Sequence, residues 1–422
     1  MLHSSLLHET VQLAIDDRVL ILNSAADPFM LEAAQRLSAG ELILAEDNLA
    51  SLQQFNKLVG TDVLLPSPMN TPVGADLSRP SPNVDVNTKS QPSVGADLSR
   101  PSPIYRPQLH MRHVPFHEYT LREAPATIDV AILNILYQPS NAWMIYGLQV
   151  AAYALKPGGR LYVIGAKDRG VLSIAKRMQS LFGNLETLVI SKGQRVVCSH
   201  MQNNSLDQHS HDEPPDANTM SETQNVLAPL AGAKQGVAPA RLANPIPDLQ
   251  PSTFAEGKLD EGTRLLVEAL EVHTTDIALD IGCGTGYIGM HIAHVASKGH
   301  VTMVDASLVA VDAARHMIEQ SGMTNVQVLA SNGTQAVKEQ RFDLIATNPP
   351  FHLGGIQTTE IGERFIREAA QVLRPRGRFY LVANRFLKYE PTLRTCFHSV
   401  EEVGGNTRYK VLLATNPIMS RK

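Results

Sequence analysis

The feature that most constrains the fold is a pair of segments that occurs in both halves of the chain. IDVAILN at positions 128–134 matches FDLIATN at 342–348, and LKPGGRLYVIGAK at 155–167 matches LRPRGRFYLVANR at 373–385. The order is the same in both halves and the spacing is similar. One match could arise by convergence of strand sequences, but two in register indicate a duplicated unit.

Both halves alternate apolar, β-branched runs with amphipathic stretches, a pattern typical of the strand and helix units of a mainly parallel sheet. In the C-terminal half the apolar runs end at polar or glycine residues, at 274–282, 299–305, 326–332, 342–348 and 377–384. We therefore predict an α/β protein with two Rossmann-like domains in tandem. In such sheets, ligands bind beyond the carboxyl ends of the strands.

Two segments lack the composition of a packed core. The first, at about 66–103, is rich in proline and contains the exact repeat VGADLSRPSP at 73–82 and 94–103. We interpret it as a flexible insertion; the repeat fits a tolerated duplicated loop better than a recognition peptide. The second, at 201–251, has no hydrophobic period and predicts a linker. The domains are then 1–200 and 252–422.

The composition of the chain indicates the cellular compartment of the protein and the kinds of site that it can contain. The three cysteines (Cys198, Cys283 and Cys396) are far apart in the sequence and form no Cys-x-x-Cys pair, which indicates free buried thiols in a reducing compartment. No apolar run is long enough to span a membrane, and the N-terminus lacks the features of a signal peptide. We expect a cytoplasmic protein without a membrane anchor. The His-Ser-His-Asp run at 209–212 lies in the predicted linker, so we expect no metal site.

A glycine-rich loop follows the apolar run that ends at Asp280. Gly282, Gly284 and Gly286 allow a sharp turn from strand to helix and a close approach of a ligand to the main chain. With Gly289 the loop also satisfies G-x-G-x-x-G, and Asp305 follows about 20 residues later. On this spacing alone, a dinucleotide such as NAD remains possible.

Two acidic residues favour S-adenosylmethionine over NAD. Asp280 stands before the first glycine, where a carboxylate would repel a pyrophosphate but suits a cationic amino-acid group. Asp305 can accept hydrogen bonds from both ribose hydroxyls, and we include its neighbour Ala306 among the cofactor-binding residues. Asn332 and Gly333 end the next apolar run, where an adenine edge would lie, although an asparagine there is also an ordinary turn residue.

The sequence Asn348, Pro349, Pro350, Phe351 is the most specific motif of the chain. The Asn348 side-chain oxygen and the Pro349 carbonyl can each accept an N–H of an amine, which localises its lone pair and stabilises the developing positive charge. Consecutive prolines stiffen the loop. Phe351 offers a face on which a flipped or unpaired base can stack. These four residues are the predicted catalytic residues; His352 is not needed as a base.

The C-terminal half resembles that of the bacterial ribosomal RNA guanine-N(2)-methyltransferases. The resemblance covers residues 254–414 and rests on LDIGCGTGYIG, VTMVD, ASN and FDLIATNPPFH, preceded by FAEGKLDEGTRLLVEAL. It implies a class I methyltransferase domain that uses S-adenosylmethionine to methylate the exocyclic amine of a guanine in ribosomal RNA. It also implies that the N-terminal domain is a degenerate copy of the catalytic one.

The N-terminal half departs from the motifs as such a copy would. LNSAADPF at 22–29 stands in place of the glycine loop, and NILY at 134–137 replaces Asn-Pro-Pro-Phe. We expect this half neither to bind the cofactor nor to methylate. The resemblance suggests that it helps to bind RNA and stabilises the catalytic domain.

The expected partner is ribosomal RNA or a ribosomal subunit, bound by a monomer. Because the formal net charge is −4, contact with RNA must come from a local basic patch. A candidate patch near the C-terminus consists of Arg374, Arg376, Arg378, Arg385, Lys388 and Arg394. A solvated face, or cations at a helix C-terminus, would explain several of these residues equally well.

Three alternatives stay open on the sequence. The same Asn-Pro-Pro-Phe motif would serve a methyltransferase of a protein glutamine amide or of an adenine amine. The glycine spacing allows an NAD-dependent oxidoreductase, but that reading gives the motif no role. A non-catalytic RNA-binding protein is disfavoured by the intact motifs of the second half.

Overall fold

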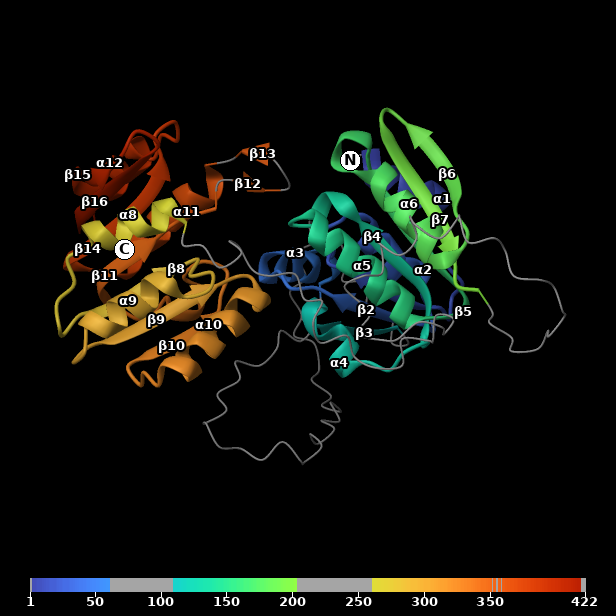
Figure 1. The fold of residues 1–422 in the computed structure, drawn as a ribbon, viewed down its shortest axis with the longest axis horizontal. Helices are drawn as coiled ribbons and strands as arrows, with labels where there is room; N and C mark the ends of the chain where they lie inside the picture. The colour runs from blue at the N-terminus through green and yellow to red at the C-terminus, as the bar shows by residue number, and fades with distance from the viewer. Residues whose placement is uncertain are drawn as a thin grey trace, which may run out of the picture.

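The computed structural model describes residues 2–60, 109–202, 260–350, 352–353, 356–357 and 359–418. The predicted insertion at 66–103, nearly all of the predicted linker at 201–251 and the His-Ser-His-Asp run lie outside the described residues, so the domain limits stay predictions. The described residues form two seven-stranded sheets, one in each half of the chain (Figure 1).

The two sheets have the same strand order. The N-terminal sheet runs β3-β2-β1-β4-β5-β7-β6 and the C-terminal sheet runs β10-β9-β8-β11-β14-β16-β15. In each sheet the first five strands are parallel, and the last two join antiparallel. The strands of the N-terminal sheet are β1 (Arg18–Leu22), β2 (Glu41–Ala45), β3 (His110–Val114), β4 (Ile128–Asn134), β5 (Leu155–Ala166), β6 (Glu186–Ser191) and β7 (Gln194–His200).

The C-terminal sheet confirms the strands expected from the apolar runs. Its strands are β8 (Ile277–Ile281), β9 (His300–Asp305), β10 (Val326–Ala330), β11 (Phe342–Thr347), β14 (Leu373–Asn384), β15 (Phe397–Gly405) and β16 (Tyr409–Pro417). The short strands β12 (His352–Leu353) and β13 (Ile356–Gln357) form a separate hairpin after β11. The predicted pair of Rossmann-like α/β domains is confirmed, and the shared strand order fits the inferred duplication.

Helices cover both faces of each sheet, because the central strands are buried on both sides. In the N-terminal domain, α1 (Leu2–Thr10), α2 (Phe29–Arg36) and α3 (Leu49–Val59) pack on one face, and α5 (Asn141–Ala154) and α6 (Val171–Phe182) on the other. The short α4 (Tyr119–Arg122) belongs to the second group.

The C-terminal domain repeats this layering. Helices α8 (Glu261–Ala269), α9 (Tyr287–Val295) and α10 (Leu308–Ser321) cover one face, and α11 (Glu360–Val372) and α12 (Glu390–Cys396) cover the other. Figure 1 shows α3 on the side of the N-terminal domain that faces the C-terminal domain.

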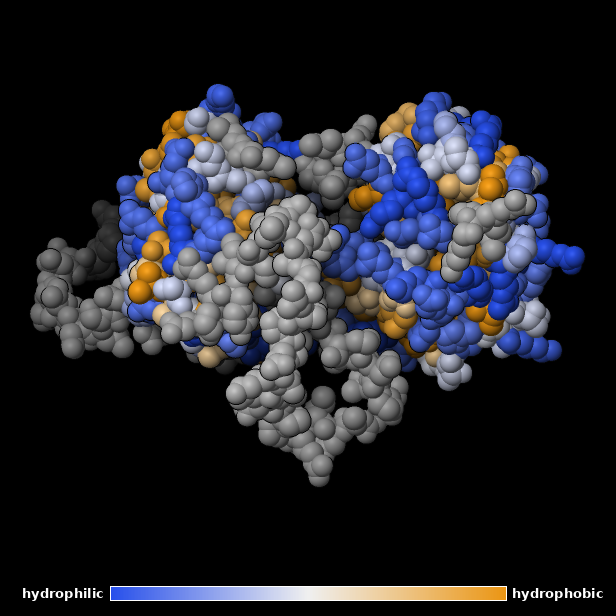
Figure 2. Space-filling model, turned by 180° about the vertical axis from the view of Figure 1, so that it is seen from behind, coloured by the Kyte–Doolittle hydropathy of each residue, from blue (hydrophilic) through white to orange (hydrophobic). Residues whose placement is uncertain are grey.

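The surface carries mostly hydrophilic side chains over both domains, with hydrophobic ones scattered among them, on the face shown in Figure 2. Within the described residues, every helix is too short or too polar to cross a lipid bilayer.

Candidate active site

The asparagine of the Asn-Pro-Pro-Phe motif lies beside the glycine loop. Strands β8 and β11 are parallel neighbours in which Thr347 pairs with Ile281. The Thr347 hydroxyl donates a hydrogen bond of 2.7 Å to the Ile281 carbonyl oxygen, which holds the two strand ends together. Asn348 and Gly282 are the next residues of the two strands, so the chain leaves the sheet at adjacent points.

The structure fixes which end of the Asn348 carboxamide is free. The Asn348 Nδ2 donates to Asp260 Oδ2 and to Thr263 Oγ1, both at 3.0 Å. A carboxylate only accepts hydrogen bonds, so the nitrogen must face Asp260 and the side-chain oxygen must point away from it. Asp260 is itself held in place, because it caps α8 by accepting from the Thr263 backbone N–H at 3.1 Å.

The rest of the motif is described in part. The Pro349 side chain is buried and that of Pro350 is exposed, which fixes the course of the chain after Asn348. Phe351 lies outside the described residues. Figure 1 shows the hairpin of β12 and β13, which follows the motif, projecting from the C-terminal sheet toward the N-terminal domain.

The glycine loop turns the chain from β8 into α9 with its backbone open to a ligand. Gly282, Gly284 and Gly286 have φ values of 71°, 56° and 90°, in the left-handed region that glycine tolerates best. The Gly282 N–H donates 2.8 Å to the Val304 carbonyl oxygen, which ties the loop to β9. A Cβ placed on Gly284 would meet no other atom within 4 Å, so there is room for a ligand at this point.

Asp280 is fully buried beneath the loop and has one unsatisfied oxygen. Its Oδ2 accepts from the Gly289 N–H at 2.9 Å, whereas its Oδ1 is buried without a hydrogen-bond partner. Burial, aided by the nearby Asp305 charge, raises the pKa of Asp280 to about 7. A buried carboxylate oxygen without a partner is the acceptor that a cationic ligand group would satisfy.

Asp305 links the loop to the turn after β9. Its Oδ2 accepts from the Gly284 N–H at 2.9 Å, and its Oδ1 accepts from the Ser307 N–H at 2.8 Å. Burial raises the pKa of this carboxyl group. Each oxygen retains a further lone pair, so the carboxylate can still accept two hydroxyl groups. Ala306 lies in the same turn.

Asn332 and Gly333 form the turn after β10, next to this site. The Asn332 carboxamide is already engaged, because its Oδ1 accepts from Arg364 at 2.7 Å and its Nδ2 donates to Gln53 at 2.8 Å. To contact an adenine edge as predicted, Asn332 would therefore use its main chain or a side-chain atom that already has a hydrogen-bond partner. Gly333 has a φ of 63°, and a Cβ on it would lie 2.0 Å from a Glu368 oxygen.

Comparison with known proteins places this site in a family. Residues 248–413 match the family model described as "Methyltransferase small domain". A ribosomal RNA small subunit methyltransferase C of Hahella chejuensis is 33% identical over 265 residues, which cover 63% of this chain and 71% of that protein. A protein of the same name from Shewanella loihica is 29% identical over 72% of this chain and 84% of its own length.

The chain belongs to the ribosomal RNA small subunit methyltransferase C family. It is therefore a methyltransferase, which removes the NAD-dependent alternative that the glycine spacing left open. A solved structure described as the T. thermophilus 16S rRNA N2 G1207 methyltransferase in complex with AdoMet and guanosine covers 99% of this chain and 92% of its own. It has a TM-score of 0.67 and 24% identity, which shows a common two-domain fold.

The N-terminal domain of the methyltransferase has hydrogen-bonded side chains where the C-terminal domain has its glycine loop. Glu46 stands where Asp305 stands in the other domain and likewise accepts from a loop N–H, that of Ala25, at 3.0 Å. Asp27 accepts from Asn134 at 2.6 Å, and Gln138 donates to the Leu22 carbonyl oxygen at 3.1 Å. These side-chain contacts lie where the other domain has its glycine loop and its Asn-Pro-Pro-Phe motif, and the inactivity of this copy stays a prediction.

A contact between the domains, which the sequence did not reveal, involves the turns after β9 and β10 of the methyltransferase. The Leu49 N–H donates to the Ala306 carbonyl oxygen at 2.9 Å, and the Leu308 N–H donates to the Asp47 carbonyl oxygen at 2.8 Å. Gln53, on α3, joins Asn332 and also donates to Gln335 at 2.8 Å. The N-terminal domain thus braces the turns after β9 and β10.

An ion cluster lies in the same contact. His117 is buried and hydrogen-bonds through its two ring nitrogens to Asp47 at 2.6 Å and Asp312 at 2.9 Å. Together with Glu118, His117 and Asp312 have ligand atoms close enough to hold a metal ion. Because both His117 nitrogens already face carboxylates, we interpret the cluster as structural, and the absence of a metal stays a prediction.

The prediction of one basic patch near the C-terminus is wrong. Arg374, Arg376 and Arg378 lie at the start of β14, whereas Arg385 and Lys388 follow its opposite end. Three of the arginines are also neutralised within the domain, by the pairs Arg374 with Asp343, Arg378 with Asp276, and Arg385 with Glu402. These cations are close together in the sequence, but they lie at the two ends of one long strand. They are therefore far apart in the structure.

Proposed function

We propose that the chain transfers the methyl group of S-adenosylmethionine to the exocyclic 2-amino group of a guanine in small-subunit ribosomal RNA. The observation that carries this proposal is the orientation of Asn348. Its nitrogen is held by Asp260 and Thr263, so its oxygen is left free beside the glycine loop. The T. thermophilus relative of the same fold, described as bound to AdoMet and guanosine, supports the choice of cofactor and base.

The chemistry requires an acceptor for each N–H rather than a strong base. The lone pair of an aromatic amine is delocalised into its ring, so the amine is a poor nucleophile. The Asn348 oxygen and the Pro349 carbonyl oxygen would each accept one N–H, which draws the nitrogen toward tetrahedral geometry and stabilises its growing positive charge. S-adenosylmethionine, when bound, supplies a methyl group on a sulfonium, and the excess proton of the methylated amine is released to water.

The residues at the ends of β8, β9 and β10 fit the parts of this cofactor. Asp280 offers its unpartnered oxygen to the amino-acid ammonium, and Gly284 leaves room beside the main chain, in a loop that Gly282 and Gly286 allow to turn sharply. Asp305 would accept the ribose hydroxyls. Ala306, Asn332 and Gly333 would border the adenine.

The raised pKa of Asp280 predicts that cofactor binding depends on pH. The cofactor ammonium needs the ionised carboxylate, so below about pH 7 it must displace a proton from Asp280. The Kd for S-adenosylhomocysteine, which has the same ammonium group, should rise about tenfold per pH unit below about pH 7 and level off above it. Calorimetric titration of the protein across this range measures the dependence.

The matched control is Asp280→Asn, which keeps the shape and removes the titration. It should bind more weakly than the wild type near neutral pH and show no such rise in acid. A wild-type Kd that stays constant from neutral to acidic pH would show that Asp280 does not meet the ammonium group.

Transfer of a labelled methyl group tests the proposed function. Purified protein should label 16S ribosomal RNA or small subunits that lack the modification, and mass analysis of the digested RNA should identify N2-methylguanosine. The alternatives predict other products, namely an N6-methylated adenosine or a tryptic peptide with a methylated glutamine. Either of those as the main product would overturn the choice of guanine.

The proposal also includes the binding partner and the cellular compartment of the protein. We propose ribosomal RNA or an assembled small subunit as the partner and the cytoplasm, where ribosomes are, as the compartment. The N-terminal domain would support the cofactor turns through Asp47, Leu49 and Gln53. Action as a monomer is a further prediction.

A further inference from the structure

The N-terminal domain has a pocket at the end of its sheet that corresponds to the catalytic edge of the other domain. The pocket has a volume of about 610 Å³ and lies among the end of β5, the turn between β6 and β7, and Leu136, which follows β4. The Lys167 N–H donates 2.9 Å to the Gly193 carbonyl oxygen, which joins the first two of these walls. In size the pocket suits a small ligand.

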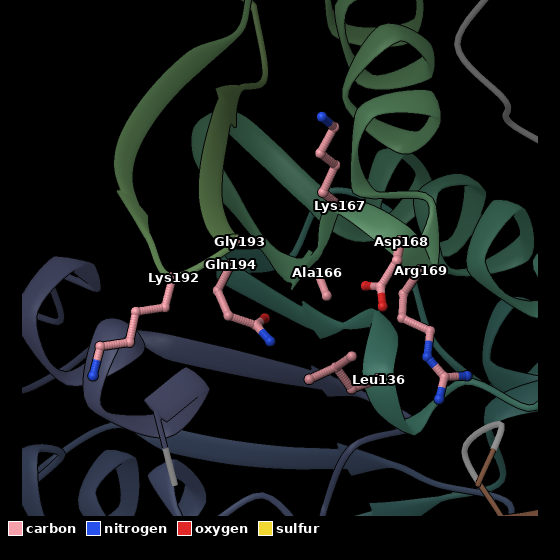
Figure 3. Close-up of a pocket in the computed structure, with 8 residues that line it drawn as sticks. All are labelled: Leu136, Ala166, Lys167, Asp168, Arg169, Lys192, Gly193 and Gln194. Carbon is pink, nitrogen blue, oxygen red and sulfur yellow. The ribbon is translucent and has the colours of Figure 1, made fainter.

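The middle of this pocket is lined by hydrogen-bond acceptors. Figure 3 shows the Gln194 carboxamide and the Asp168 carboxylate extending toward the space beside Leu136 and Ala166. The Gln194 Oε1 atom is buried and has no hydrogen-bond partner. A buried acceptor of this kind is costly unless a ligand or water donates to it, so the pocket suits a group that presents N–H or O–H.

The rim of the pocket is cationic. Lys167, Arg169 and Lys192 extend outward from its edge (Figure 3), and no ion pair joins any of them to another side chain in the described parts of the chain. The residue that corresponds to Lys167 in the C-terminal domain differs, because Arg385 pairs with Glu402 at 2.7 Å. At Lys167 the N-terminal domain therefore has a cation without an ion pair where the catalytic domain has a paired one.

Two features of the backbone also favour the binding of an anion at the rim. Helix α6 begins just after Arg169, and its N-cap, Gly170, has no side chain to cap the first N–H groups. The positive end of a helix dipole attracts anions. Lys192 stands in the turn with a φ of 46°, a conformation that asparagine and glycine adopt more readily, so a local backbone preference does not explain a lysine here.

We propose that this pocket binds an unpaired nucleotide of the RNA substrate, with its base or ribose against Gln194 and Asp168 and its flanking phosphates on Lys167, Arg169 and Lys192. The inference rests on the proposed function and deepens it. The chain has a net charge of −4 and its C-terminal arginines are largely paired, so phosphate contacts need cations elsewhere. An acceptor-lined centre with a cationic rim matches a nucleotide within a strand.

The test compares two full-length variants that each lose three cations. The first is Lys167→Gln/Arg169→Gln/Lys192→Asn, in which the asparagine suits the turn. The control is Lys298→Gln/Lys338→Gln/Arg376→Gln, which removes three exposed cations of the C-terminal domain. Binding of unmodified, transcribed 16S ribosomal RNA is measured at several salt concentrations, and thermal unfolding checks that each variant is folded.

The pocket variant should bind this RNA about tenfold or more weakly at low salt, and its salt slope should fall by about 2 relative to the wild type, since each phosphate contact contributes about 0.7–0.9. Gln194→Leu should weaken binding without changing the slope, because it removes no charge. Cytidine monophosphate, which lacks the guanine proposed for the catalytic site, should compete poorly with this RNA, because the pocket takes a nucleotide within a strand. Strong competition would assign the pocket to a free nucleotide and overturn the proposal.

The outcome for this subsite is separable from that for the proposed function. If the wild type methylates ribosomal RNA but the pocket variant has the RNA affinity, salt slope and KM of the control, the subsite is wrong and the function stands. If the wild type fails to methylate ribosomal RNA, the proposed function is wrong whatever the binding shows. Should the triple variant be unfolded, Lys192→Asn alone gives the same comparison, with a slope change of about 0.7–0.9 expected.

Discussion

Replacing Asn348 by alanine should lower kcat for methyl transfer by about 10²–10³-fold, the loss typical of removing one preorganised polar group that stabilises transition-state charge. The oxygen that accepts the amine N–H is then missing, and the Pro349 carbonyl cannot localise the lone pair alone. Affinity for S-adenosylhomocysteine should be unchanged, because Asn348 is assigned to the amine. Single-turnover transfer to unmodified ribosomal RNA measures the first effect and calorimetry the second.

The duplication supplies a matched control for this variant. Asn134, the last residue of β4, corresponds to Asn348 just after β11, but it donates to Asp27 inside the N-terminal domain. Asn134→Ala should therefore cost some stability and leave kcat unchanged. An Asn348→Ala enzyme with near wild-type turnover would remove this residue from the mechanism.

Replacing His117 by alanine should destabilise the protein by about 3 kcal/mol. The change removes the cation between Asp47 and Asp312, and breaking a buried ion pair costs about 3–5 kcal/mol. The cost lies toward the lower end here because the Asp312 side chain is 40% exposed and keeps its ion pair with Arg315. The unfolding midpoint should fall by about 6–12 °C, since 1 kcal/mol corresponds to about 2–4 °C in domains of this size. His200→Ala, at an exposed histidine, is the control and should change little.

The same cluster gives the stability a pH dependence with a definite sign. Burial alone would lower the pKa of His117, but hydrogen bonds and charge interactions with Asp312 and Asp47 outweigh it and raise the pKa to about 10. A folded-state pKa above the unfolded value means that the stabilisation is complete below about pH 6.5 and disappears as the pH rises through about 10. The difference in unfolding midpoint between wild type and His117→Ala should shrink over that range; a constant difference would show that His117 is not charged in the fold.

The cluster also bears on the cofactor site. Asp312 lies on α10, which follows the turn that contains Asp305 and Ala306, and the Asp47 carbonyl accepts from Leu308 in the same helix. Loosening this contact should therefore weaken cofactor binding as well as stability. The N-terminal domain lacks the catalytic motifs, yet it contacts the turns that we propose to bind the cofactor.

Much of the fold could be predicted from the sequence because its signals are local. The apolar runs at 277–281 and 342–347 are buried on both faces, so they stand out from the amphipathic helices around them. The glycine loop and the Asn-Pro-Pro-Phe motif follow those runs directly, and parallel pairing then brings them together.

The parts that could not be predicted depend on contacts between residues far apart in the chain. Asp260 holds Asn348 across 88 positions, and Gln53 reaches Asn332 across 279. Asp260 does carry a local signal as the N-cap of a helix, but nothing in that signal indicates what else its carboxylate accepts. The prediction of one basic patch near the C-terminus was wrong for the converse reason. Residues that are close in the sequence can lie at opposite ends of one strand.

A crystal structure of the full chain with S-adenosylhomocysteine and guanosine would show directly whether Asn348 and Pro349 hold the amine. We expect the guanine 2-amino nitrogen to lie about 2.7–3.2 Å from both the Asn348 Oδ1 atom and the Pro349 carbonyl oxygen, with the cofactor sulfur on its open side. A guanine bound with its 2-amino group facing away from Asn348, or an Asn348 oxygen that bonds only to protein, would contradict the account.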